Sequence, residues 1–219
     1  MATETTVEDY LKAVWNAGEW SDAPVTVTGL AQRLGLSPSS VSELVRKLTE
    51  RGLLTHARYG SVELTDEGRA IALATVRKHR LIETFLVEYL GYDWDQVHDE
   101  AEVLEHAVSD DFVARLAARL GEPTHDPHGD PIPTADGELP AEDHASLDQV
   151  EPGARVRVAR VSDDDPELLR HLRDVGMEIG TVVELVAVRQ AAGTVELSLG
   201  AASVTLGLPA SRVILTEPA

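Results

Sequence analysis

Four side chains in the middle of the sequence belong to the residue types that bind divalent metals without sulfur. His98, Glu102, Glu105 and His106 are spaced at i, i+4, i+7 and i+8. Because a helix has 3.6 residues per turn, these spacings bring all four side chains into one narrow sector of a helix. Two carboxylates and two imidazoles would then converge, which is a suitable ligand set for a divalent cation.

A second pair with the same character precedes them. His79 and Glu83 are four residues apart in a segment that also has a helical pattern. Acidic side chains gathered at one place repel one another, and a bound cation removes that cost. Any one of these residues alone is more simply explained as a solvated acid or as a histidine of the core. Six of them on two consecutive helices favour a metal site.

Composition narrows the choice of metal and of compartment. The chain of 219 residues contains no cysteine, so a metal must be held by oxygen and nitrogen ligands. Hydrophobic residues make up 43% of the chain, but no run approaches the roughly 20 apolar residues that cross a bilayer. The N-terminal segment lacks the basic-then-apolar pattern of a secretion signal. We therefore expect a cytoplasmic protein that does not associate with membranes.

The charge of the chain is unevenly distributed. A formal net charge of −19 argues against nucleic-acid binding, because duplex DNA repels an acidic surface. The segment between Val25 and Leu64, however, contains five basic residues and only three acidic ones. Ordinary solvated helix faces would explain so small a surplus, and the segment becomes meaningful only through the motif that it contains.

That motif is a helix-turn-helix followed by a hairpin. An amphipathic helix is predicted for residues 6–17, with Thr5 or Thr6 as its N-cap. The stretch VTGLAQRLGLSPSSVSELVRKLTERGLL then reads as two helices around a short turn, with Pro38 at the start of the second. Two short strands, about 53–56 and 62–65, flank a basic and aromatic tip. This order predicts a winged helix-turn-helix.

The second helix of the motif, residues 38–51, would enter the major groove of DNA, with the hairpin as a wing. Serines near its start would face base edges and phosphates, although serine reads sequence only weakly. The candidate DNA-contacting residues are Ser37, Pro38, Ser39, Ser40, Ser42, Glu43, Arg46, Lys47, Arg58 and Tyr59.

The rest of the chain divides into a helical part and a β part. Helices are predicted at about 66–90, 94–110 and 111–120, the last with an apolar stripe suited to a dimer interface. A segment rich in proline, glycine and acids follows, its first half tethered rather than free. From residue 147 onward, short β-branched runs surround a helical insert at 166–174, which indicates a small SH3-type barrel.

The expected fold is therefore mainly α with small β parts. We expect a winged helix-turn-helix at 1–72, a helical dimerisation and metal-binding domain with its linker at 73–140, and an SH3-like domain at 141–219.

Two acidic residues have simple structural explanations. Asp9 falls within the capping-box pattern Thr6-Val7-Glu8-Asp9, where the helix dipole favours an acid. Asp165 stands immediately before Pro166, which is the pattern of an N-cap followed by proline in the first helical position.

Across nearly its whole length the sequence resembles the diphtheria toxin repressor family, in particular its manganese-responsive members. The segments that carry the resemblance are TTVEDYLKAVW, LGLSPSSVSELVRKLTERGLL, RKHRLIETFL, VHDEAEVLEHAVSD and DPHGDPIP, the last ahead of the SH3-like domain.

The resemblance implies two metal sites. The primary site would consist of Asp9, Glu102, Glu105 and His106, and the second would draw on His79, Glu83 and His98, with Asp126, His128 and Asp165 as additional ligands. Iron-type members carry methionine at the position of Asp9 and cysteine at that of Glu102. Oxygen donors at both positions favour manganese.

Two positions depart from the pattern of the family. Lys12 stands where some two-domain manganese regulators have an acid that helps to bind a second adjacent ion, which argues against a binuclear primary site. Leu168 occupies the position of a glutamine ligand in the iron-type C-terminal domain.

The sequence thus predicts a Mn(II)-activated repressor that binds a palindromic operator in double-stranded DNA as a homodimer. One alternative is an iron(II)-responsive repressor of the same architecture, with Fe(II), Co(II) or another divalent ion as its effector. A metal-dependent hydrolase is the less favoured alternative, because the sequence contains no signature of a substrate pocket.

Overall fold

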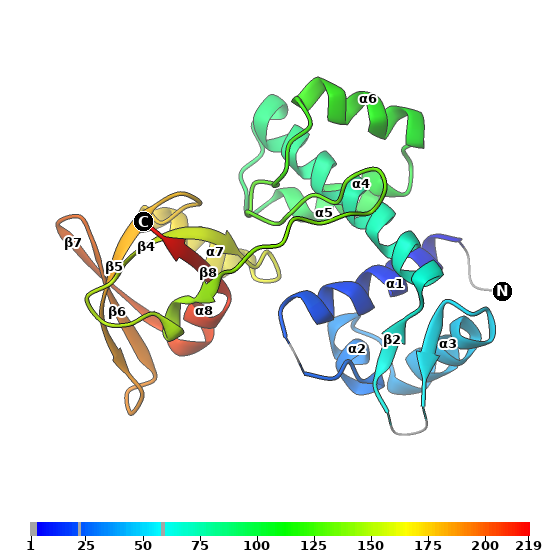
Figure 1. Ribbon diagram of the computed structural model, residues 1–219, viewed down its shortest axis with the longest axis horizontal. Helices are drawn as coiled ribbons and strands as arrows, with labels where there is room; N and C mark the ends of the chain where they lie inside the picture. Colours follow the sequence, from blue (N-terminus) through cyan, green and yellow to red (C-terminus); the bar gives the residue numbers. More distant parts are fainter. Residues whose placement is uncertain (1–3, 22, 58–59) are drawn as a thin grey trace. The chain divides into compact units, whose positions relative to one another are not determined.

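A computed structural model describes residues 4–21, 23–57 and 60–219 of the chain (Figure 1). The chain divides into two compact units, an N-terminal unit of residues 1–79 with 133–138 and a C-terminal unit of residues 80–132 with 139–219. Among the described residues, no helix combines the length and apolar character needed to cross a membrane.

The N-terminal unit contains the predicted winged helix-turn-helix. Helices α1 (Glu4–Glu19), α2 (Val27–Arg33) and α3 (Pro38–Glu50) precede the antiparallel strands β1 (Leu54–His56) and β2 (Val62–Leu64). Their apolar faces meet in one core, whose fully buried members include Leu11, Leu30, Leu48 and Leu54.

Local sequence explains where the two helices of the motif begin. The Thr26 hydroxyl accepts a hydrogen bond from the Gly29 amide and caps α2, and Ser37 caps α3 in the same way through the Ser40 amide. Pro38 occupies the first turn of α3, where its missing amide proton costs nothing.

Helix α1 begins earlier than predicted. Its first described residue is Glu4, so Asp9 lies in the second turn rather than beside the N-cap. The capping explanation for Asp9 is therefore wrong, because a capping carboxylate must lie within reach of the first free amides.

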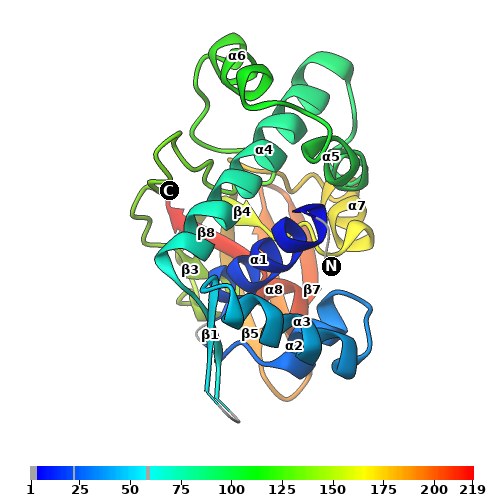
Figure 2. The same ribbon diagram turned by 90° about the vertical axis from the view of Figure 1, so that its right-hand side faces the viewer.

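Helix α4 (Asp66–Leu90) is one uninterrupted helix that contributes residues to both units (Figure 2). In the C-terminal unit it is followed by α5 (Val97–Glu105) and α6 (Asp110–Leu120), and the three share a core that includes Leu81, Leu86, Val97 and Leu116. The predicted helix 94–110 is shorter, since His106 caps its C-terminus and Ser109 caps the next helix.

The segment after α6 is tied down as expected in its first half. The Asp126 carboxylate accepts hydrogen bonds from the amides of His128 (2.8 Å) and Asp130 (2.9 Å), which closes a tight turn. Gly129 has a φ of +81°, and a Cβ at this position would lie 2.0 Å from the Ala159 carbonyl oxygen. The turn therefore packs directly on the strand that contains Ala159 and has no space for a larger residue.

The remainder of the C-terminal unit is an antiparallel six-stranded sheet with strand order β3-β8-β4-β5-β6-β7. The strands are β3 (Ala145–Ser146), β4 (Arg155–Val161), β5 (Val182–Arg189), β6 (Thr194–Leu199), β7 (Ala202–Gly207) and β8 (Ile214–Pro218). A 3-10 turn (Leu147–Gln149), α7 (Pro166–Asp174) and α8 (Leu208–Arg212) complete it. The predicted fold class, including the helical insert at 166–174, is confirmed.

Candidate metal centres

Helix α4 presents an imidazole and a carboxylate on one face. His79 precedes Glu83 by four residues, so the helix itself stacks the two side chains. Both are buried, and the Glu83 carboxylate is almost completely removed from solvent. A buried carboxylate requires a positive partner, because burial strongly disfavours an isolated negative charge.

The two oxygens of Glu83 face different imidazoles. Oε1 lies 3.5 Å from Nδ1 of His98 on α5, and Oε2 lies 3.8 Å from Nδ1 of His128 in the turn after α6. Asp163, between β4 and α7, approaches the same nitrogen of His98 at 2.8 Å. We call Glu83, His98, Asp126, His128 and Asp163, together with His79, the second metal centre.

The geometry of His128 fixes which of its nitrogens is available. Nε2 lies 2.7 Å from the carbonyl oxygen of Trp94, and a carbonyl can only accept, so Nε2 must carry the proton. Nδ1 is then the atom directed at Glu83. A metal-binding histidine is typically held in this way, with its other nitrogen donating to a carbonyl or carboxylate.

The charges of the centre perturb one another. Burial lowers the pKa of His98, but the hydrogen bonds to Asp163 and Glu83 outweigh it and raise that pKa to about 11. Burial raises the pKa of Asp163, but the bond from His98 lowers it to about 2. Burial raises the pKa of Asp126, and repulsion by Asp130 and Glu83 raises it further. Such a site favours added positive charge.

Two buried arginines support the turn that carries Asp126 and His128. Arg80 lies 3.8 Å from the Asp126 carboxylate and 3.6 Å from that of Asp130, and donates to the Pro131 carbonyl at 2.7 Å. Arg160, which lies on β4, forms an ion pair with Asp130. These contacts fix the turn against α4 and the sheet.

A divalent cation fits the second metal centre. Within the described part of the chain, Asp126 Oδ2 and His128 Nδ1 are buried without a hydrogen-bond partner. Unsatisfied buried polar atoms are costly, and here they converge with the Glu83 carboxylate, with ligand atoms of the three residues within 4.8 Å of one another. Carboxylate oxygens and imidazole nitrogens are also the donors that Mn(II) and related ions accept.

Three of the four ligands predicted for the primary site lie in the C-terminal unit. Glu105 is buried on α5 and lies 3.4 Å from Nε2 of His106, and Glu102 lies 3.6 Å from Nε2 of His98. We call Glu102, Glu105 and His106 the first metal centre. Asp9, the fourth predicted ligand, is on α1 in the N-terminal unit.

Asp165 is not brought to the second metal centre. Its carboxylate caps α7 by accepting from the amides of Glu167 (2.9 Å) and Leu168 (3.2 Å). Asp163, which is not among the predicted ligands, contacts His98 instead. Three consecutive aspartates precede Pro166, and only the tertiary turn determines which of them faces the helices. Leu168 packs on the core of the sheet.

The candidate DNA-contacting residues of α3 and of its N-cap are exposed. Ser37, Pro38, Ser39, Ser40 and Ser42 are exposed, while Val41, Leu44, Val45 and Leu48 turn into the core. Arg46 and Lys47 are exposed too, but Glu43 contacts both, at 2.9 and 3.3 Å. Arg58 and Tyr59, predicted at the wing tip, lie outside the described residues.

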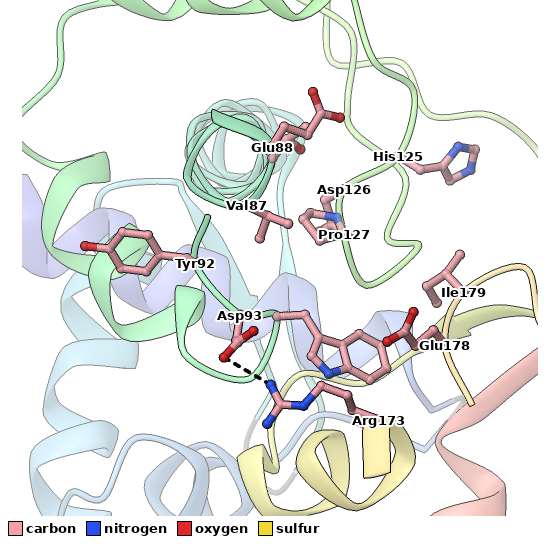
Figure 3. A pocket seen from close by; sticks show the side chains of 12 residues that line it. Val87, Glu88, Tyr92, Asp93, His125, Asp126, Pro127, Arg173, Glu178 and Ile179 are labelled. Carbon is pink, nitrogen blue, oxygen red and sulfur yellow. Dashed lines mark ion pairs between the residues drawn. The ribbon is translucent and has the colours of Figure 1, made fainter. Parts of the chain in front are cut away.

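A cavity of about 380 Å³ borders the second metal centre in the C-terminal unit (Figure 3). Its walls come from the end of α4, the loop before α5, the turn at 125–127, and α7 with the residues after it. Asp126 is one of the lining residues. Two other lining residues, Asp93 and Arg173, form an ion pair at 3.2 Å.

Three family models match the chain in succession. Residues 2–62 match the iron dependent repressor N-terminal DNA binding domain, residues 65–134 its metal binding and dimerisation domain, and residues 145–218 the FeoA domain.

Two curated relatives show similarity over most of the chain. The iron-dependent repressor IdeR of Mycobacterium tuberculosis is 36% identical over 184 residues, which cover 78% of this chain and 80% of that protein. The diphtheria toxin repressor of Corynebacterium glutamicum is 33% identical over 195 residues, with 83% of each covered.

Solved structures show the same similarity in three dimensions. One described as a manganese-dependent transcriptional repressor in complex with manganese has 49% identity and a TM-score of 0.93, covering 97% of this chain and all of that chain (100%). ScaR with bound Cd²⁺ has 36% identity and a TM-score of 0.85, covering 97% and 99%.

Proposed function

We propose that this chain, which belongs to the diphtheria toxin repressor family of metal-dependent DNA-binding repressors, is activated by Mn(II). The family is one of transcriptional repressors, so the hydrolase alternative is excluded. The observation that carries the choice of metal is the donor set: buried carboxylates and imidazoles without sulfur, with Asp126 Oδ2 and His128 Nδ1 lacking hydrogen-bond partners among the described residues. Hard oxygen donors suit manganese better than sulfur-containing sites do.

Metal would act on DNA binding through the first metal centre. We propose that Asp9 of α1 completes the set of Glu102, Glu105 and His106. Asp9 is the one ligand of this set on the unit that contains the helix-turn-helix. A cation shared by both units would therefore restrict how the DNA-reading helices are presented. Binding of this kind stabilises whichever conformation holds the cation more tightly.

A homodimer would bring two such units to one operator. The apolar stripe predicted on α6 is not free to form the whole interface, because two of its residues, Val113 and Leu116, pack inside the helical core. The large apolar side chains that remain exposed on α4, α5 and α6 are Tyr89, Leu90, Val103 and Phe112. We propose that these side chains contribute to the dimer interface. Two heads would then read half-sites about one helical turn apart in a palindromic operator, in the cytoplasm.

Iron is the second candidate effector. Two similarities favour it: the matching family models are named for iron dependence, and the relative IdeR is named as iron-dependent. Against it, the proposed ligands of the first metal centre here include no sulfur donor. The two alternatives share one architecture and differ only in the ion that activates DNA binding.

Gel-shift titration distinguishes these alternatives. Duplexes selected from a random-sequence pool by the Mn(II)-loaded protein serve as probe, at fixed salt, with Mn(II), Fe(II), Zn(II) or chelator. We expect Mn(II) to tighten binding about 5–150-fold over chelator, the usual range of coupling between two sites. Asp9→Ala should abolish this activation while the dimer persists. Equal affinity with and without chelator would overturn the proposal, and stronger activation by Fe(II) would favour the iron alternative.

A further inference from the structure

Three consecutive residues between α4 and α5 connect a ligand of the second metal centre to helix α7. Asp93, Trp94 and Asp95 belong to neither helix. Trp94 contacts the ligand His128, whereas Asp93 and Asp95 contact Arg173 on α7. We call these residues the 93–95 clamp.

On one side, the clamp holds His128. The Trp94 carbonyl accepts the Nε2 proton of His128 at 2.7 Å, and the indole and imidazole rings stack with centroids 6.0 Å apart at 17°. The hydrogen bond fixes the protonated nitrogen, and the stacking fixes the plane of the ring. Together they direct Nδ1 at Glu83.

On the other side, the clamp holds α7. The Asp95 side chain is fully removed from solvent, and it pairs with Arg173 at 2.7 Å and with Arg170 at 3.6 Å. Asp93 adds a second contact to Arg173 at 3.2 Å (Figure 3). The Trp94 indole packs on the core of the sheet. Since α7 begins three residues after Asp163, these contacts locate the turn that presents Asp163 to His98.

His98 lies in the first turn of α5 and follows the last residue of the clamp by three residues. One short segment thus locates His98 through the chain, His128 through the Trp94 carbonyl, and Asp163 through Arg173. A buried carboxylate such as Asp95 makes the arrangement specific, because losing its arginine would leave an uncompensated buried charge.

We propose that the 93–95 clamp sets the metal affinity of the second metal centre, with Arg173 as a positioning residue that contacts no ligand atom. Metal bound at this centre and attachment of the sheet to the helices of the C-terminal unit then stabilise each other. This inference rests on the proposed metal-dependent function, since it requires that the second metal centre binds Mn(II).

Calorimetric titration of the full chain with Mn(II) tests the proposal. Glu83→Gln identifies the heat that belongs to the second metal centre. Arg173→Met should weaken that centre about 10–100-fold, the usual effect of removing a group that orients a ligand, and leave the first metal centre unchanged. Asp95→Asn should weaken Mn(II) binding at the second metal centre in the same way. The double variant Asp95→Asn/Arg173→Met should bind Mn(II) no more weakly than the weaker of the two single variants, because both substitutions break the same ion pair. Arg173→Lys should recover most of the affinity.

Arg157→Met is the matched control, since Arg157 lies in the same sheet and forms an exposed pair with Glu217 at 3.5 Å. It should bind Mn(II) like wild type. Should circular dichroism show that Arg173→Met unfolds, Arg170→Met replaces it, because the half-exposed Arg170 contacts the same carboxylate. Wild-type affinity in the folded clamp variants overturns the inference alone. Absence of any second-centre heat in wild type overturns both the inference and the proposed second centre.

Discussion

When one ring N–H of a histidine donates a hydrogen bond to a carbonyl, only the other ring nitrogen can bind a metal ion. In His128 the Trp94 carbonyl occupies Nε2, and Nδ1 is buried without a hydrogen-bond partner among the described residues. Burial would lower the pKa of this imidazole, but the carboxylates of Glu83 and Asp126 outweigh burial and raise it. A cation at Nδ1 would satisfy both the nitrogen and the two carboxylates.

His128→Ala should therefore lower the number of Mn(II) ions bound per chain and make the segment after α6 more sensitive to protease. Activation through the first metal centre should persist but require more manganese, because an ion bound to the active conformation adds to its population only through differential affinity. Calorimetry and limited proteolysis in parallel would measure both effects.

His125→Ala is the natural control for this variant. His125 lies three residues earlier, is exposed, and pairs with Glu142 rather than with the metal centre. It should retain the wild-type stoichiometry. Identical stoichiometry and cleavage rates for His128→Ala and wild type would mean that His128 is only a linker residue.

Residue types could be predicted from the sequence better than their partners. The i, i+4 pair of His79 and Glu83 follows from helix geometry alone. The choice of Asp163 over Asp165 does not, because it depends on how the turn before α7 folds. The hydrogen bond between Trp94 and His128 left no sequence signal, since a backbone carbonyl makes it.

At the scale of the helix, α3 pairs its candidate DNA-contacting cations with an acid of its own. Glu43 is hydrogen-bonded to Arg46 and contacts Lys47, and these two partners lower the pKa of Glu43 to about 2, so it remains charged at any physiological pH. If α3 contacts DNA as proposed, phosphates would have to compete with this carboxylate for both cations, which would weaken sequence-independent binding.

Glu43→Gln should tighten binding to non-operator duplex DNA and steepen its salt dependence. Each additional phosphate contact adds about 0.9 to the slope of log K against log salt. Glu196→Gln is a matched control, because Glu196 also pairs with an exposed arginine, Arg189, but in the C-terminal sheet. Fluorescence anisotropy across a salt series would measure the slopes, and equal slopes for Glu43→Gln and wild type would contradict the prediction.

Two glycines of the linker segment offer a matched pair. Both have positive φ, +81° at Gly129 and +77° at Gly137, where an L-residue costs about 1–2 kcal/mol. At Gly137 an added Cβ would meet Leu73 at an ordinary 3.6 Å, whereas at Gly129 it would lie 2.0 Å from the Ala159 carbonyl.

Gly137→Ala should therefore lose about 1–2 kcal/mol of stability, and Gly129→Ala should lose more. Gly129→Ala should also weaken Mn(II) binding, because the turn that carries Asp126 and His128 cannot seat on the sheet. Thermal melts would measure the loss of stability, and calorimetry would measure the loss of Mn(II) affinity. Equal losses in both variants, with unchanged metal binding, would show that the close packing of Gly129 is unimportant for the centre.

Elements were predicted more reliably than their ends. The helical insert at 166–174 matches α7 because Asp165 and Pro166 form a strong N-terminal signal. The helix predicted at 94–110 is shortened on both sides, because the apolar pattern continues through the cap at His106 and the clamp residues before Val97. Periodicity reports which residues face a core, but it does not show where the backbone leaves the helix.

At the scale of the whole molecule, a net charge of −19 opposes both DNA binding and the gathering of buried acids. Divalent cations bound at the two proposed centres would offset the cost of gathering these acids. Ions that bind only the folded state stabilise it by about 2.7 kcal/mol at a concentration of 100 times the dissociation constant. The free energy of unfolding should therefore report the two centres even in the absence of DNA.

Mn(II) should raise the melting temperature of the wild-type chain, and Mg(II) at the same concentration should raise it much less. Both are divalent, so general screening of the acidic surface is equal for the two ions. They differ in ligand preference, because Mg(II) favours carboxylate, carbonyl and water oxygens, whereas the centres here combine carboxylates with imidazoles. Glu83→Gln should lose part of the Mn(II) effect, since both oxygens of Glu83 belong to the second metal centre. If Mg(II) stabilised the chain as much as Mn(II), and Glu83→Gln changed neither effect, the ions would be acting on surface charge rather than on the centres.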